Sequence, residues 1–568
     1  MSEQSIYTLP EGKINSWEDI APAFEALSLF EIRDAGAFKN WLKALSDLES
    51  RISEDLAWRY IKMTCDTEDE SLENDYLNFV SNIQPHISPW EDTLNKKIAS
   101  SPFLIDLSAD PAYSIYFKRI KKDIKLFREE NIPVQVRLQT NAQKFGSINA
   151  AMTIELAGKE LTLQQAAVHL KSSDRKHRED VFSKIQNRRG EDRNTLDALL
   201  DELIRDRHLL AQNAGFSNFR DYMHEALGRF DYSVDDCYAF HAAVEKVVVP
   251  LNKRLMEKRK KALKLNSMKP WDLEVDPQGN EALHPFEDGK DLAEKTIRAF
   301  ERLDPFFADV IHTMRDKGQL DLNSRKGKAP GGYNYPLAVT GYPFIFMNAA
   351  SAQRDLETMV HEGGHAIHSV LTKELPLQAF KDCPSEVAEL ASMSMELISM
   401  EVWDEFYQNA NDWNRAKREQ LEGVIHTLPW IATVDAFQHW LYTNPTHDPL
   451  ERKKAWLDIS NRFGTGMVDW TGFEEAQAYG WQKQLHIYEV PFYYIEYGFA
   501  QLGAIATWKY RLEHPSKNLE PYKNALALGY TRSIPEIYQT AGARFDFSET
   551  YVAELFDFVH RELTRLEE

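Results

Sequence analysis

The chain has 568 residues, of which 43% are hydrophobic and 27% are charged, a composition typical of globular proteins. This length exceeds what one hydrophobic core serves, so we expect more than one lobe. Acidic residues outnumber basic ones by 88 to 67, and the net charge of −21 argues against nucleic acid or an anionic membrane surface as a partner.

The three cysteines, Cys65, Cys237 and Cys383, lie far apart and form no CxxC pair, so no disulfide framework is expected. The N-terminal stretch MSEQSIYTLPEGK contains no apolar segment of the kind found in secretory signals. Apolar runs in the sequence are also shorter than a bilayer crossing requires. These features together favour a reducing, cytoplasmic location.

Helical periodicity dominates the sequence from end to end. Apolar residues recur at steps of three and four in residues 35–63, 194–216 and 233–263, which predicts long helices. Strand patterns are few. Residues 151–163 predict a hairpin with a Gly-Lys turn, and residues 342–350 predict a short apolar strand.

Two segments lack either period and predict loops. Residues 264–290 contain three prolines and two glycines, and residues 324–335 are basic and rich in glycine. The sequence shows no internal repeat, so domain boundaries are set only by these changes in pattern. We place them near 110 and 195, which divides the chain into 1–110, 111–195 and 196–568.

Residues 357–371, ETMVHEGGHAIHSVL, contain an HExxH motif. On a helix, His361 and His365 lie one turn apart on the same face, where two imidazoles can bind one zinc ion. Glu362 projects nearby and can accept a proton from a zinc-bound water, whose pKa the metal lowers to about 7. Gly363 and Gly364 each cost a helix interior about 1 kcal/mol relative to alanine, so we expect another element or a substrate to approach the helix backbone there.

A catalytic zinc ion needs a third protein ligand. His368 lies about 10.5 Å along the helix axis from His361, too far for one ion to join them. The stretch from Pro384 past Glu401 predicts a second helix with a row of glutamates among apolar residues. One of these could complete the site while another orients a histidine, and their spacing leaves the choice open among Glu386, Glu389 and Glu396. A buried helix with two satisfied histidines and a solvated acidic face is the alternative.

HEGGHAIH followed by PSEVAELASMSMEL resembles the thimet oligopeptidase group of zinc endopeptidases, and more closely its bacterial oligoendopeptidase F branch. Residues 486–504, HIYEVPFYYIEYGFAQLGA, resemble the tyrosine-rich segment of that branch, and residues 161–185 resemble its accessory helical region. The resemblance covers roughly residues 115–560.

The resemblance implies a mainly α fold of two helical lobes that enclose a deep substrate channel, with a few short β-strands near the metal site. It assigns Glu389 as the third zinc ligand. It makes residues 1–110 an N-terminal helical region, 111–195 an accessory region and 196–568 the catalytic domain. The implied activity is endopeptidase hydrolysis of short peptides, with folded proteins excluded from the channel.

In this interpretation His361, His365 and Glu389 leave one position of the single Zn²⁺ ion open to water. Glu362 is the general base and then passes the proton to the leaving amine. A hydroxyl or imidazole donor would stabilise the tetrahedral intermediate by about 3 kcal/mol. The candidates lie in the tyrosine-rich segment, in order of preference Tyr497 and His486, then Tyr493 and Tyr494.

The strand at 342–350 is expected to pair with an extended peptide by edge addition, which would bring Asn348 into contact with substrate. Gly464 and Gly466 in NRFGTGM predict either a flexible loop beside the site or an ordinary turn. The basic loop from Lys328 to Tyr333 either caps the channel or is solvated.

Two other functions fit parts of the sequence. A helical zinc carboxypeptidase or dipeptidyl carboxypeptidase would need a group that reads the free C-terminus, and the sequence does not place one. A peptide-binding protein with an inactive site would lack residues that are present here. The oligomeric state and the cleavage-site preference are not determined by the sequence.

Overall fold

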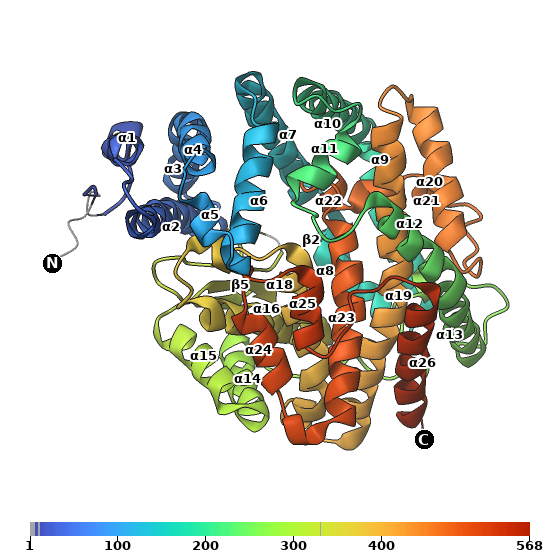
Figure 1. Ribbon diagram of the computed structural model, residues 1–568. Coiled ribbons are helices and arrows are strands. Elements are labelled where there is room, and N and C mark those ends of the chain that lie inside the picture. The colour runs from blue at the N-terminus through green and yellow to red at the C-terminus, as the bar shows by residue number, and fades with distance from the viewer. Residues whose placement is uncertain (1–5, 9–11, 330, 568) are drawn as a thin grey trace.

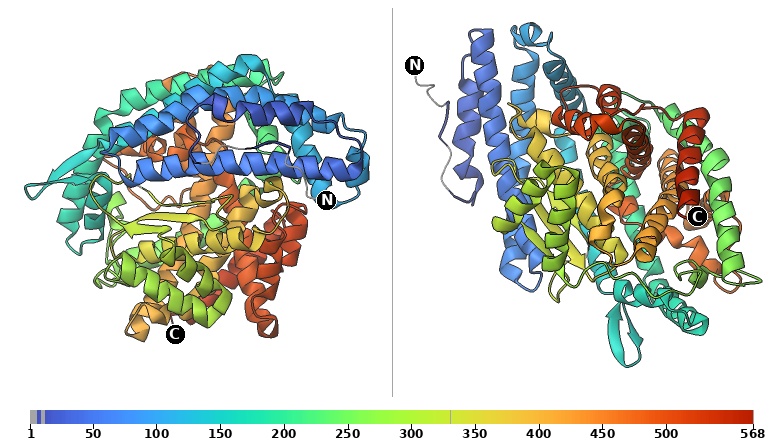
Figure 2. Two further views of the ribbon diagram at one scale, coloured as in Figure 1. Left: turned by 90° about the vertical axis from the view of Figure 1, so that its left-hand side faces the viewer. Right: turned by 90° about the horizontal axis from the view of Figure 1, so that it is seen from below.

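The computed structural model describes residues 6–8, 12–329 and 331–567. Helices dominate it, so the predicted mainly α class is confirmed (Figure 1). The N-terminal helices form a layer along one side of the molecule (Figures 1 and 2). Their core also takes in Leu377 and Phe380 from far along the chain, which joins this layer to the rest. The layer contains α1 (Ala21–Leu29), α2 (Ala35–Cys65), α3 (Glu70–Asn78), α4 (Gln84–Ala99), α5 (Leu104–Leu107) and α6 (Pro111–Leu126).

The predicted hairpin is confirmed and projects from the body of the molecule (Figure 2). Its turn residues are Ala157 and Gly158, both with positive φ, so the turn is Ala-Gly and the predicted Gly-Lys turn is wrong by one residue. Helices precede and follow the hairpin along the chain. They and its strands are α7 (Ile132–Ala150), β1 (Thr153–Leu156), β2 (Lys159–Thr162), α8 (Leu163–Val168), α9 (Arg175–Glu191) and α10 (Arg193–Asn213).

The predicted helix at 233–263 is interrupted by a π-helical turn at Val244–Val248. Pro250 follows, and because its nitrogen carries no hydrogen it cannot donate within the helix, so the wider turn accommodates it. Around this point the chain forms α11 (Phe219–Ala226), α12 (Val234–Ala243), α13 (Val249–Ala262), α14 (Gly289–Leu303) and α15 (Pro305–Asp316). Apart from a 3-10 turn at Pro270–Asp272, the segment between α13 and α14 is irregular, as predicted.

The remaining helices carry the largest core. They are α16 (Gln353–Thr372), α17 (Gln378–Lys381), α18 (Ser385–Ser399), α19 (Ala410–Thr443), α20 (Pro449–Phe463), α21 (Glu474–Ala478), α22 (Leu485–Tyr488), α23 (Tyr494–Glu513), α24 (Glu520–Ala527), α25 (Ile534–Thr540) and α26 (Glu549–Arg565). The most extensive helix contacts join α18 to α23 and to α16. The division at 110 and 195 stays a prediction.

A three-stranded sheet lies beside α16. Its strands are β3 (Leu320–Asn323), β4 (Tyr333–Tyr335) and β5 (Phe344–Ala349), in the order β3-β5-β4. β5 is parallel to β3 and antiparallel to β4. The predicted strand therefore exists but is paired on both sides, so the prediction that it adds a peptide at its own edge is wrong. The edge strands are β3 and β4, and β4 consists of three residues of the segment predicted as a loop.

The loop before β4 is held by Lys328, whose side chain is fully buried. Its ammonium group donates to the carbonyl oxygens of Asp321 and Asn323 and to the Asp321 carboxylate, each at 2.9 Å, and also to the carbonyl of Met347. The expectation of a solvated basic loop is therefore wrong for this residue.

The same loop is joined to α2 of the N-terminal layer. The N–H of Thr67 donates to the carbonyl of Gly327 at 2.7 Å, and the N–H of Ala329 donates to the carbonyl of Thr64 at 2.8 Å. The hydroxyls of Thr64 and Tyr333 are 2.6 Å apart. Backbone and side-chain hydrogen bonds thus connect α2 and the residues after it to β4 and to the loop before it.

Within the described residues, the helices are each too short or too polar to cross a membrane. Much of the N-terminal stretch on which the prediction about a secretory signal rests lies outside those residues.

Candidate metal centre

The metal-binding motif lies on α16, where that helix crosses α18. Added to Gly364, a Cβ would lie 2.7 Å from the Cα of Ser392 and 2.8 Å from the carbonyl oxygen of Ala391. A Cβ on Gly363 would lie 2.9 Å from the ring of Phe300. The two glycines thus let other helices approach the α16 backbone, which was one of the two expectations. The approaching elements are α18 and α14.

His361, His365 and Glu389 form a group whose potential ligand atoms all lie within 4.8 Å of one another. Glu389 Oε2 is 3.4 Å from His361 Nε2 and 3.6 Å from His365 Nε2. A tetrahedral zinc ion with bonds of about 2.0–2.1 Å needs ligand atoms about 3.4 Å apart, so the two imidazoles and the carboxylate fit zinc.

The environment favours the protonation states that bind a metal at His365 and Glu389. Burial lowers the pKa of His365 to about 4, so its imidazole is neutral at pH 7. Burial alone would raise the pKa of Glu389, but the nearby histidines and a hydrogen bond from Tyr493 outweigh it and lower the pKa to about 2. For His361, hydrogen bonds to carboxylates outweigh burial and raise the pKa well above its ordinary value.

The other two glutamates considered as ligands have different partners. Glu396 Oε1 lies 2.6 Å from Nδ1 of His361, and Gln420 Nε2 donates to Glu396 Oε2 at 2.7 Å. Glu386 is turned away and accepts a hydrogen bond from the hydroxyl of Tyr232 at 2.5 Å. Glu396 therefore orients a histidine from behind, a position that tunes metal affinity. The helix that carries them ends at Ser399, earlier than predicted, and continues as a 3-10 turn over Met400–Glu405.

Glu362 is buried beside the two histidines, and its Oε2 has no hydrogen-bond partner among the described residues. Burial raises the pKa of its carboxyl to about 7. A carboxyl group with a free oxygen and a pKa near neutrality can take up and release a proton.

The tyrosine-rich segment packs against the same centre. The hydroxyl of Tyr493 donates to Glu389 Oε1 at 2.8 Å. The rings of Tyr493 and Tyr497 are 5.2 Å apart, and that of His486 lies 5.8 Å from Tyr497 and 4.6 Å from Tyr494. All four predicted residues are therefore gathered in one cluster, with Tyr493 bonded to the predicted metal ligand.

A hydrogen-bond chain fixes the protonation of His486. The indole Nε1 of Trp430, which can only donate, lies 3.0 Å from Gln484 Oε1. The amide nitrogen of Gln484 must then donate to His486 Nδ1, 2.7 Å away. Burial lowers the pKa of His486 to about 4, so the neutral ring carries its proton on Nε2. Sequence reasoning missed Trp430 and Gln484, because neither belongs to a recognisable motif.

Two cavities meet at the metal centre, with volumes of about 510 and 420 Å³. His365, Glu389 and Tyr493 line the first, whereas Glu396, His486 and Tyr494 line the second. The residues that line both are Gly332, His361, Glu362 and Tyr497. The centre is thus open on two sides.

Three other predicted residues do not line the two cavities at the metal centre. The side-chain amide of Asn348 donates to the carbonyl oxygens of Ala329 and Gly331 at 2.7 and 2.9 Å, and its contact with substrate stays a prediction. Gly464 and Gly466 line a third cavity that contains none of the metal-centre residues, so their predicted place beside the site is wrong.

Comparison with known proteins matches residues 168–556 to peptidase family M3 and residues 13–127 to the peptidase M3 N-terminal domain. The chain therefore belongs to peptidase family M3. Within that family it falls in the oligoendopeptidase F branch. The chain is 22% identical to oligopeptidase PepF of Bacillus subtilis, in a match that covers 68% of this chain and 56% of PepF.

The chain is 24% identical to the chromosomal oligoendopeptidase F of Lactococcus lactis subsp. cremoris over 56% of its own length and 52% of that protein. The matches thus span about half the length of these curated relatives. Among solved structures, PZ peptidase A with an inhibitor has a TM-score of 0.92 at 25% identity, with 98% of both chains covered. The oligoendopeptidase F of Enterococcus faecium, with a TM-score of 0.65 at 18% identity and 97% of both chains covered, shares the fold.

Proposed function

We propose that the protein is a zinc-dependent endopeptidase that hydrolyses short peptides. The observation that carries this proposal is the donor set, in which Glu389 Oε2 lies 3.4 and 3.6 Å from the Nε2 atoms of His361 and His365. Membership of peptidase family M3 supports the reaction class. When bound, zinc would act as a Lewis acid and lower the pKa of a water molecule to about 7.

The residues around the centre have separate roles in this proposal. Glu396 holds His361 by its Nδ1 so that Nε2 faces the other two ligands. Glu362 accepts a proton from the attacking water and delivers it to the nitrogen of the leaving amine. Its burial suits this task, because burial brings the pKa of the carboxyl to about 7, where both proton uptake and proton release are accessible.

Tyr497 and His486 are the proposed donors to the oxyanion. Tyr497 lines both cavities, and His486 presents an Nε2 proton because its Nδ1 accepts from Gln484. Tyr493 is the weaker candidate, since its hydroxyl proton is already given to Glu389. Tyr494 lines only the second cavity. One well-placed donor of this kind contributes about 3 kcal/mol to the transition state.

The edge strand β4 is the proposed track for the peptide backbone. Its Asn334 side chain donates to the carbonyl oxygen of Glu362 at 3.2 Å, which fixes β4 against α16. One side of β4 pairs with β5, so its other side can pair with an extended peptide. This replaces the predicted pairing with β5 itself.

Two cavities meeting at the centre favour an endopeptidase over an exopeptidase. A peptide that extends in both directions from the scissile bond needs space on each side, whereas a carboxypeptidase needs a closed end next to the metal. The alternative, a helical zinc carboxypeptidase or dipeptidyl carboxypeptidase, would require a cation that reads the C-terminus near the metal. Arg354 lines the second cavity, but its guanidinium lies 3.2 Å from the Glu357 carboxylate.

The test combines metal analysis with hydrolysis of an internally quenched peptide blocked at both ends. Wild-type protein should contain one zinc ion per chain and cleave the blocked peptide. The Glu362→Gln variant should retain zinc but lose about 10²–10⁴-fold in kcat, the usual contribution of a general base. Equal turnover in the two proteins would refute the assigned base. Cleavage that requires a free C-terminus would favour the carboxypeptidase alternative.

A further inference from the structure

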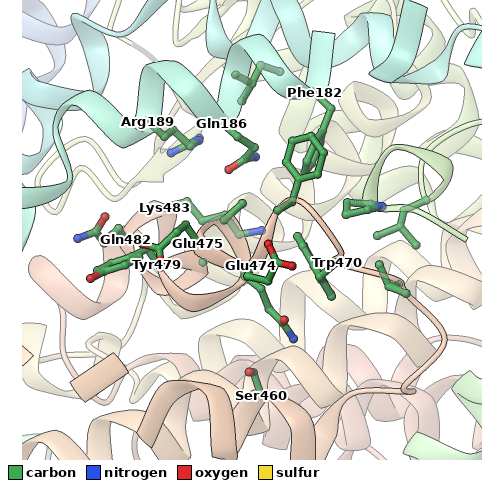
Figure 3. A pocket seen from close by; sticks show the side chains of 18 of the residues that line it. Phe182, Gln186, Arg189, Ser460, Trp470, Glu474, Glu475, Tyr479, Gln482 and Lys483 are labelled. Carbon is green, nitrogen blue, oxygen red and sulfur yellow. The ribbon is translucent and has the colours of Figure 1, made fainter. Parts of the chain in front are cut away.

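A third cavity, of about 710 Å³, lies apart from the metal centre. Figure 3 shows it between α9, which carries Gln186 and Arg189, and the segment that carries Tyr479 and Lys483 on the facing wall. Its volume is within the range of about 300–1,000 Å³ typical of ligand sites. Aromatic side chains form much of its wall, namely Phe182, Trp430, Trp456, Trp470, Phe473 and Tyr479.

Two cations face this cavity without a counter-ion. Within the part of the chain that the structure describes, neither Arg189 nor Lys483 forms an ion pair or a side-chain hydrogen bond. Lys483 Nζ lies 4.8 Å from the ring centroid of Trp430, which is its one aromatic contact there. Burial lowers the pKa of both groups. By accessible surface Arg189 is half-buried and Lys483 is exposed, so an anion could reach both groups from solvent. A partly buried cation without a partner gains from an anion that joins it.

Apart from Glu274, the other charges that line the cavity have partners. Arg193 lies 2.8 Å from the Glu475 carboxylate, which also pairs with Lys453. The Glu474 carboxylate accepts the N–H of Gly472 at 3.1 Å. Glu274 attracts Lys483, but the repulsion between Lys483 and Arg189 is the larger effect. Among the described residues, two cations and one carboxylate of this cavity therefore lack an ion pair, which leaves a net positive charge.

Ion pairs hold the α9 wall of the cavity in place. Arg175 and Arg178 of α9 both donate to the carboxylate of Asp272, at 2.7 and 2.8 Å. Asp272 is fully buried in the 3-10 turn Pro270–Asp272, so this double ion pair holds α9 against the segment between α13 and α14. A preformed site loses little conformational entropy when it binds.

We propose that this cavity binds the carboxylate-bearing end of a peptide, with the carboxylate between Arg189 and Lys483 and an apolar side chain against the aromatic wall. The identity of the ligand as a peptide rests on the proposed function. Arg189 lies in the last turn of α9, where the helix dipole is negative, so a singly charged carboxylate suits the site better than a phosphate dianion.

The position of the cavity gives this site a role in substrate selection. Trp430 lines the cavity, while Thr427 and Ile431 on the same stretch of α19 line the 420 Å³ cavity at the metal centre. Trp430 is also the first member of the chain that orients His486. A C-terminal carboxylate bound here lies at a distance from the metal centre. The site would therefore select peptides by their length and by a free C-terminus, while cleavage takes place at an internal bond.

The test measures binding to the full chain carrying Glu362→Gln, by fluorescence anisotropy of an octapeptide labelled at its N-terminus. Three forms of the peptide are compared: one with no acidic side chain and a free C-terminal carboxylate, its C-terminal amide, and an amide with one internal glutamate. Arg189→Met and Lys483→Met should each weaken binding of the free acid by about tenfold or more, because a charge-assisted hydrogen bond contributes about 1.5–3 kcal/mol. The simple amide should bind all proteins alike.

Lys176→Met is the matched control, since it removes an exposed cation from the same helix α9 without touching the cavity. It should leave the affinity for all three peptides unchanged. A loss confined to the glutamate-containing amide would support the cation site with a side-chain carboxylate as its ligand. Two results would overturn the proposal. One is equal affinity of the Glu362→Gln protein for the free acid and the simple amide; the other is unchanged affinity of the Arg189→Met and Lys483→Met variants for both carboxylate peptides. Lys483→Gln serves as a second variant should Lys483→Met unfold.

Equilibrium binding requires no turnover, so its result stands apart from the proposed activity. Absence of hydrolysis by the wild-type protein would refute the proposed function while leaving the binding comparison interpretable.

Discussion

Nδ1 of His361 lies 2.6 Å from Oε1 of Glu396, and the second oxygen of that carboxylate is held by Gln420. This contact turns Nε2 of His361 toward the other two proposed ligands, His365 and Glu389. An anionic partner on Nδ1 also makes Nε2 a stronger donor of electrons to a metal.

Replacement of Glu396 by alanine should therefore weaken zinc binding without removing a ligand. We expect a loss of about 10–100-fold in zinc affinity, the usual effect of such partners, measured by competition with a chromophoric chelator. Glu374→Ala, at an exposed position after α16, is the control and should bind zinc like the wild type. Equal affinities for Glu396→Ala and Glu374→Ala would show that the contact does not tune the site.

Alanine substitutions should have opposite effects on stability at Gly364, where α16 crosses α18, and at Gly423 in α19. In Gly364→Ala the new Cβ would meet backbone atoms of α18 at 2.7 and 2.8 Å, and overpacking of this kind destabilises by about 1–3 kcal/mol. Gly423 lies inside α19 with nothing within 4 Å of its added Cβ, so Gly423→Ala should stabilise by about 0.5–1 kcal/mol.

Urea unfolding of both variants measures these changes. Zinc affinity should fall only in Gly364→Ala, because a wider crossing separates Glu389 from the two histidines. A Gly364→Ala protein as stable as the wild type would contradict the close crossing.

The chain from Trp430 through Gln484 predicts the tautomer of His486. In Gln484→Leu the Nδ1 atom loses its donor, so the proton is no longer confined to Nε2 and kcat should fall by about tenfold or more. In Gln484→Glu the carboxylate can only accept, which should draw a proton to Nδ1 and raise the pKa of His486. Nitrogen-15 NMR of the histidine ring reports both changes. An unaltered tautomer in Gln484→Leu would rule out the relay.

The loop before β4 predicts a pH dependence of stability. Burial alone would raise the pKa of Asp321, but hydrogen bonds from Arg325 and Lys328 outweigh it and lower the pKa to about 2. Because the folded-state pKa is below the unfolded value of about 3.9, the ionised carboxylate stabilises the fold above about pH 4. That contribution is lost as the pH falls toward 2.

Asp321→Asn should therefore be less stable than the wild type at pH 6, and the difference should shrink as the pH is lowered below 4. Unfolding by urea at a series of pH values measures both free energies. A difference independent of pH would assign the effect to packing rather than to charge.

The sequence was sufficient for features that depend on local pattern. The HExxH helix, the following glutamate-rich helix and the hairpin strands all follow from residue spacing, because helix and strand periods fix which side chains share a face. The glycine pair also predicted a close approach, now assigned to Ser392 and Phe300. The resemblance supplied Glu389, which spacing alone had left among three glutamates.

Features that depend on contacts between distant segments were missed. β4 has only three residues and exists because β5 pairs with it, so no local pattern marks it, and the central position of β5 is likewise invisible in its sequence. Gln484 matters because Trp430, 54 positions away, restricts its amide. Arg189 and Lys483 become a pair only when α9 packs on the C-terminal part.

The bonds from α2 to the loop before β4 have a mechanical consequence. Because Thr64 and Thr67 bind that loop through main-chain atoms, a rigid-body displacement of the N-terminal layer must carry the loop and the adjoining strand β4 with it. If β4 binds the peptide as proposed, loading and release of substrate depend on helices that contribute no group to the chemistry. Cross-linking α2 to its neighbours should then slow turnover without lowering the zinc content.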